Sequence, residues 1–154
     1  MLDFINGQLQ AMATLNQGPN TDCCFELRTL ELHSSLIRSV EGAFPAGVNL
    51  ATGVEYGPKD WRVTIRSYGE SVAELGRSMH EWFFQMHYSP KVQGGDWVAQ
   101  NVIAEVMESL KGLIGIFEVH EIFVTPPVWY EASWQDFVLV GKDKIYMLHF
   151  GVTD

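Results

Sequence analysis

The strongest constraint on the fold is a pair of apolar runs near the end of the chain, at residues 137–140 and 145–151. Only four residues, Gly141-Lys142-Asp143-Lys144, separate them, and these are polar. Two β-forming runs joined by so short a connection can hardly avoid pairing as an antiparallel hairpin. The chain must therefore build antiparallel sheet at this end.

Three other segments carry apolar residues at spacings of three and four, which predicts amphipathic helices. The first covers residues 3–15. Two more lie in the middle of the chain, at residues 71–87, which open with a capping-box pattern, and at residues 96–112. Asp96 is suited to cap the second of these central helices and Gly112 to end it.

Strands are expected on both sides of the central helices. Residues 61–66 alternate apolar and polar side chains, which is the period of a strand with one buried and one wet face. Residues 24–32 read as a strand that leads into a helical turn, and residues 116–125 as a further strand. Residues 44–60 are so rich in Gly and Pro that they predict a long loop, with one short strand at residues 48–50.

This order of elements predicts the α+β class. We expect a mostly antiparallel sheet, packed on one face by the two central amphipathic helices and closed by the C-terminal β-hairpin. A chain of 154 residues has the length of a single α+β domain spanning residues 1–154. Strands and helices do not alternate as a doubly wound fold requires, and the glycine-rich nucleotide-binding motifs are absent.

The net charge of the chain restricts the classes of partner that it is expected to bind. The chain has 19 acidic and 10 basic residues, a formal net charge of −9, which disfavours binding to nucleic acid or to an anionic membrane surface and favours a basic protein. The first ten residues lack a basic region followed by an apolar stretch, so we expect an untargeted, cytoplasmic protein. The adjacent Cys23 and Cys24 are expected to be reduced thiols.

No motif specifies a reaction, so we expect no catalytic residues, no cofactor and no metal. His80 and His87 lie seven residues apart on one predicted helix, and we interpret them as half-buried packing residues rather than metal ligands. His149 interrupts an apolar run and is expected to face across the sheet. The alternative pairs His149 with Glu118 or Asp136 as a general base.

The most unusual stretch is PPVWYEASWQD at residues 126–136, where a stiff diproline precedes three large aromatic residues interleaved with acids. Tryptophan and tyrosine anchor protein interfaces, and flanking carboxylates attract a basic partner. The alternative is that the two tryptophans fill the core under the helices. The candidate partner-binding residues are Trp129, Tyr130, Glu131, Trp134 and Asp136.

In its size, its acidity, its lack of a catalytic motif and its closing hairpin DFVLVGKDKIYMLHFG, the chain resembles small acidic bacterial immunity proteins. These neutralise the toxins of contact-dependent or secreted toxin systems. No single residue carries the resemblance. It implies a stoichiometric protein-binding inhibitor, a monomer or small homo-oligomer, that blocks the active site or substrate-binding face of a basic cognate toxin, often a nuclease.

Two other functions stay open. One is a small enzyme or ligand-binding module with a pocket between the sheet and the helices, lined by His87, His149 and a tryptophan. The other is a self-associating subunit of a larger assembly.

Overall fold

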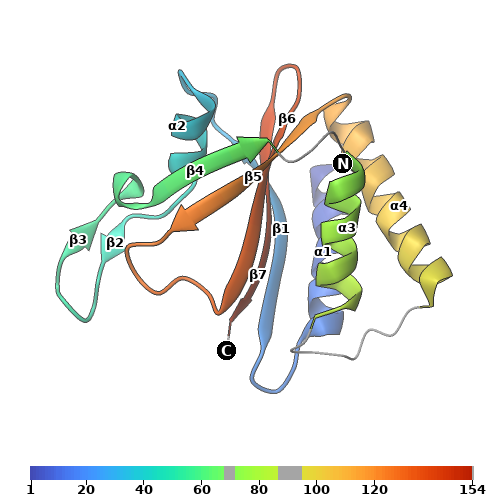
Figure 1. Cartoon of the computed structure of the whole chain (residues 1–154), viewed down its shortest axis with the longest axis horizontal. Coiled ribbons are helices and arrows are strands. Elements are labelled where there is room, and N and C mark those ends of the chain that lie inside the picture. Colours follow the sequence, from blue (N-terminus) through green and yellow to red (C-terminus); the bar gives the residue numbers. More distant parts are fainter. Residues whose placement is uncertain (68–71, 87–94, 154) are drawn as a thin grey trace.

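The computed structural model describes residues 1–67, 72–86 and 95–153, which form an α+β fold (Figure 1). Five strands make one antiparallel sheet in the order β1-β7-β6-β5-β4. They are β1 (Asp22–Leu30), β4 (Arg62–Ser67), β5 (Glu118–Thr125), β6 (Ser133–Val140) and β7 (Ile145–Thr153). The α-helices are α1 (Leu2–Asn16), α2 (Leu36–Glu41), α3 (Val72–Phe84) and α4 (Asp96–Ile114). The predicted fold class and the hairpin of β6 and β7 are confirmed.

Strand β7 organises the sheet because it is buried on both faces. It lies between β1 and β6 and pairs with β1 along its whole length. Successive side chains of a strand point to opposite faces, so β7 supplies two cores. The core on the helix side receives Tyr146, Leu148, Phe150 and Val152. The core on the other side receives Ile145 and Met147, and His149 shares their face.

Helices α1, α3 and α4 cover one face of the sheet (Figure 1). The two predicted central helices are α3 and α4, and α1 joins them in the same layer. At the centre of this core, the ring of Phe25 lies 5.8 Å from that of Phe83 and 5.4 Å from that of Phe150. Aromatic pairs in such tilted and edge-to-face arrangements contribute beyond the area that they bury.

Helix α1 also protects an edge of the sheet. The side-chain amide of Asn6 donates to the carbonyl oxygen of Leu27 at 2.9 Å and accepts from the Leu27 N–H at 2.7 Å. Strand β1 is an outer strand, and outer strands expose backbone groups that invite pairing with other chains. Asn6 therefore satisfies part of this open edge while it attaches α1 to the sheet.

The opposite face is covered by α2 and by residues 44–61 (Figure 1). The predicted long loop is largely irregular, with β2 (Gly47–Val48) paired to β3 (Glu55–Tyr56) and a 3-10 turn, η1 (Pro58–Asp60). Buried Trp61 stacks on Phe44 at a centroid distance of 4.9 Å, and its indole N–H donates to the Pro45 carbonyl at 2.9 Å. The segment thus carries its own small aromatic core.

Three predicted boundaries are wrong. Helix α4 does not end at Gly112. This glycine has the backbone conformation of the helix and the helix continues through it. The helix ends before Gly115, whose φ of 82° and ψ of −138° suit only glycine. Asp96 is the first helical residue rather than the cap, which is Gly95. Strand β6 begins at Ser133, four residues before the apolar run 137–140 that predicted it. The capping-box residue Ser71 lies outside the described residues.

Alanine should have opposite effects on stability at Gly112, which lies inside α4, and at Gly115, which follows it. A Cβ at Gly112 has only an ordinary contact with Met1 at 3.8 Å, so Gly112→Ala should raise the free energy of unfolding by about 0.5–1 kcal/mol. Gly115→Ala should lower it by about 1–3 kcal/mol because the backbone conformation is strained for alanine. Urea unfolding of both variants checks this, and equal effects would contradict the assigned helix end.

Candidate functional site

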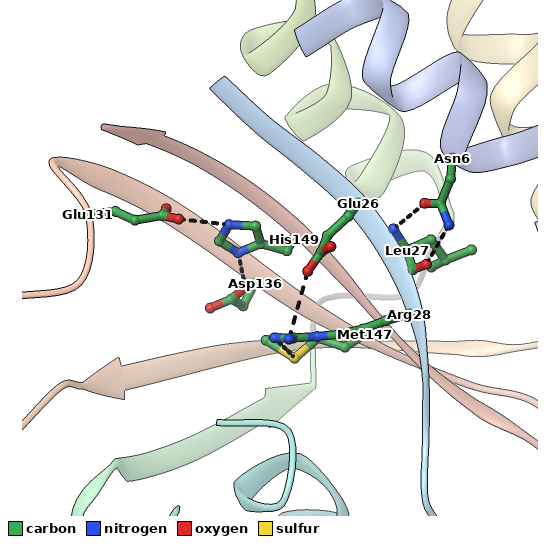
Figure 2. A network of polar contacts seen from close by, with 8 residues as sticks. All are labelled: Asn6, Glu26, Leu27, Arg28, Glu131, Asp136, Met147 and His149. Carbon is green, nitrogen blue, oxygen red and sulfur yellow. Dashed lines mark hydrogen bonds and ion pairs between the residues drawn. The ribbon is translucent and has the colours of Figure 1, made fainter. Parts of the chain in front are cut away.

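The structure brings three of the five candidate partner-binding residues together around His149, and Figure 2 shows two of them, Glu131 and Asp136. Glu131 and Asp136 contact the imidazole, and the ring of Tyr130 lies 6.0 Å from it. The Trp134 ring lies 5.3 Å from the Tyr130 ring. Trp129, by contrast, is 68% exposed.

His149 is held between two carboxylates. Its Nδ1 donates to Asp136 Oδ1 at 2.7 Å, and its Nε2 donates to Glu131 Oε1 at 3.1 Å. The side chains of His149, Asp136 and Glu131 are 4%, 0% and 11% exposed. Asp136 and His149 are direct partners in the register of β6 and β7, and Glu131 reaches them from the segment before β6. His149 thus pairs with Asp136 and not with Glu118, whose carboxylate lies 3.3 Å from His120.

These contacts make the imidazole a cation at neutral pH. Burial alone lowers the pKa of His149, but the hydrogen bonds that the imidazole donates to Asp136 and Glu131 outweigh it and raise the pKa to about 9. The neighbouring Cys24 is different. Burial, followed by the charges of Glu26 and Glu131, raises the pKa of its thiol to about 11, so it is not a nucleophilic thiolate.

The arrangement favours a structural role for His149 over a general base. A general base needs one free ring nitrogen, whereas both nitrogens of His149 are bonded to carboxylates. Asp136 is also fully buried and cannot form the rim of an interface, which corrects its predicted role as a partner contact. Glu131 is nearly buried as well. The cluster of Glu131, Asp136 and His149 therefore fixes the segment before β6 onto the sheet, and we call it the buried ion cluster.

A second network lies beside the buried ion cluster on the outer strand (Figure 2). Glu26 is the cross-strand partner of His149, and its carboxylate lies 3.7 Å from the guanidinium of Arg28. Arg28 in turn donates to the sulfur of Met147 at 3.4 Å. Both charged groups are partly exposed, so this pair adds little to stability.

A separate open groove of about 560 Å³ lies between the end of α3 and the start of β6. It opens where the sheet splits, because the pairing of β5 with β6 stops at Ile122 and Asp136. Gln135 accepts from the indole N–H of Trp82 at 2.9 Å and donates to Glu121 at 2.8 Å. The lining residues are Glu81, Trp82, Gln85, Met86, Glu121, Ser133, Trp134 and Gln135.

The groove corrects one sequence-based interpretation. A pocket between the sheet and the helices was expected to be lined by His149, but His149 faces the other side of the sheet. His87 lies outside the described residues. The sequence did contain a signal for the groove. Ser133 and Gln135 lie on the same face of the strand as Phe137, which belongs to the helix-side core, and polar residues are unusual on that face.

Other candidate residues have structural explanations. His80 is half-buried with its ring 5.8 Å from that of Phe84, as predicted for a packing residue. Cys23 and Cys24 are free thiols. Among the described residues, no group of three His, Cys, Asp or Glu side chains is arranged to hold a metal ion, and no helix has the length and hydropathy needed to cross a membrane.

Comparison with known proteins finds no matching family model, no matching curated protein and no matching solved structure.

The raised pKa of His149 predicts how stability depends on pH. The imidazole binds its proton more tightly in the folded chain, with a pKa of about 9, than in the unfolded chain, with a pKa of 6.5. The contribution of this proton to the free energy of unfolding is therefore complete below pH 6.5, and it is lost as the pH rises through 9. We expect the free energy of unfolding to fall by about 3 kcal/mol across this range. Denaturant unfolding from pH 6 to 10 measures the fall, and an NMR titration of the imidazole in which His149 loses its proton near pH 6.5 would contradict it.

Gly151 should not tolerate a side chain. A Cβ there would collide with the carboxylate of Glu131 and with the His149 ring. Gly151→Ala should thus lower the free energy of unfolding by about 1–3 kcal/mol, as overpacking does. Gly57→Ala is the matched control, because a Cβ at Gly57 meets nothing within 4 Å. Similar stability of the two variants, measured by thermal unfolding, would show that Glu131 does not lie over Gly151.

Proposed function

We propose that this protein is a stoichiometric inhibitor that binds a basic protein, as a cytoplasmic immunity protein binds its cognate toxin. The observation that carries the proposal is the placement of Trp129. Its indole is 68% exposed, while the residues that follow it are fixed in the fold. Tyr130 lies against Trp61 at a centroid distance of 5.2 Å, and Glu131 belongs to the buried ion cluster.

An exposed tryptophan next to residues fixed in the fold suits binding energetically. Ordering a mobile loop costs free energy when a complex forms, and this cost is smaller where the adjacent residue, Tyr130, is already packed. Tryptophan is among the residues that most often dominate the binding energy of an interface. A partner that covers the exposed indole of Trp129 can therefore gain affinity from the area that is buried in the complex.

The net charge of −9 supports a basic partner. Opposite charges on two proteins speed their encounter and disfavour wrong partners, and both effects weaken as salt is added. A toxin with a basic substrate-binding face, such as that of a nuclease, has the complementary charge. The enzyme alternative finds no support in the buried ion cluster, because neither nitrogen of His149 is free.

The test begins with capture of the tagged protein from its native lysate at two salt concentrations, followed by isolation of the bound protein. We expect a basic protein in a complex of defined stoichiometry by light scattering, with inhibition of the partner's activity on complex formation. Failure to find such a complex at low salt would overturn the proposal.

Within that complex, Trp129→Ala should weaken affinity by about 2 kcal/mol or more, roughly 30-fold. Trp97→Ala is the matched control, because Trp97 is 75% exposed but lies at the start of α4, in the helix layer on the opposite face of the sheet from Tyr130. Titration calorimetry of both variants measures the difference. An equal loss of affinity in the two variants, or no loss for Trp129→Ala, would show that Trp129 does not lie in the interface.

A further inference from the structure

The groove between α3 and β6 has the chemistry of a site for a planar cation. Two carboxylates, Glu81 and Glu121, lie on its wall, and its described lining residues include no Lys or Arg. The carboxylate of Glu121 has one oxygen bonded to Gln135, and Glu81 is exposed at the mouth. Acidic groups on a concave surface concentrate the field and attract cations more strongly than scattered surface acids do.

An aromatic ring makes the groove more selective than its charge alone. The indole of Trp82 lines it from α3, whereas Trp134 lines it from the strand and has its ring on the other face of the sheet, against Tyr130. The Trp82 ring is held in place, because it stacks on Phe150 at 5.8 Å and its N–H is bonded to Gln135. A guanidinium group can lie flat on an indole and donate in its own plane to carboxylates, whereas an ammonium group is a compact point charge.

The backbone beside the groove is also open. Strand β6 begins at Ser133, but no residue of β5 pairs with Ser133, Trp134 or Gln135. Between these two strands the sheet is therefore incomplete at the same place where the groove lies. An extended peptide can lie along an open strand edge and bond to its backbone while one side chain enters the neighbouring pocket.

We infer that the groove binds the guanidinium group of an arginine carried on an extended segment of the basic partner. This inference rests on the proposed function and extends it, because it names the group that the acidic surface recognises. Glu81 and Glu121 accept the guanidinium hydrogen bonds, and the indole of Trp82 supplies the face on which it stacks. Trp129 is then a second, separate anchor.

The test uses a blocked pentapeptide with one arginine between serine and threonine residues. Two matched peptides carry lysine or uncharged citrulline in place of arginine. Binding at low salt is followed through the indole N–H signals in a nitrogen-15 correlation spectrum. We expect the arginine peptide to shift the Trp82 signal saturably, to leave Trp97 unchanged, and to bind at least tenfold more tightly than either matched peptide.

Variants of the groove then assign the carboxylates. Glu81→Gln and Glu121→Gln should each weaken the arginine peptide at least fivefold, and glutamine at position 121 still offers an oxygen to Gln135, which preserves the fold. Glu105→Gln, an equal charge change on the exposed side of α4, is the control. Equal shifts with the citrulline or lysine peptide, equal effects of all three variants, or no shift at Trp82 would overturn the inference.

The outcomes also separate this inference from the proposed function. If the isolated complex is weakened by Trp129→Ala but not by Glu81→Gln or Glu121→Gln, the inhibitor function stands and the arginine site is wrong. If no basic partner exists but the arginine peptide binds as described, the groove is a guanidinium site and the inhibitor function is wrong.

Discussion

The buried positive charge of His149 is the interaction on which the arrangement of the functional surfaces depends. Burying an ion costs several kcal/mol unless charges and hydrogen bonds compensate it. Here Asp136 compensates from the neighbouring strand, and Glu131 compensates from the segment that precedes β6. Because both carboxylates are themselves buried, removing one partner leaves the others uncompensated, so the three groups hold one another in place.

That constraint extends outward through the chain. Glu131 is fixed over Gly151, which has no side chain to obstruct it. Tyr130, the preceding residue, is directed into the aromatic cluster with Trp61 and Phe44. Trp129 is left outside this packing and remains exposed. The buried ion cluster thereby fixes the backbone that follows an exposed tryptophan.

The split in the sheet places the groove beside the same segment. Strands β5 and β6 diverge after Ile122 and Asp136, and the opening is lined on one side by Trp134, whose ring also contacts Tyr130. Trp134 lines the groove from the strand, while its ring lies on the face of the sheet that Tyr130 and His149 share.

Local patterns in the sequence were enough to predict the α+β class, the helices over α1, α3 and α4, and the closing hairpin, because period and loop length are properties of neighbouring residues. They also marked Trp129 and Tyr130 as unusual. The tertiary structure alone decided that Asp136 is buried against His149, that His149 faces away from the helices, and that Glu81 and Glu121 line one groove. Each of these depends on strand register and on which face of the sheet a residue occupies, and a shift of one residue in register would reverse them.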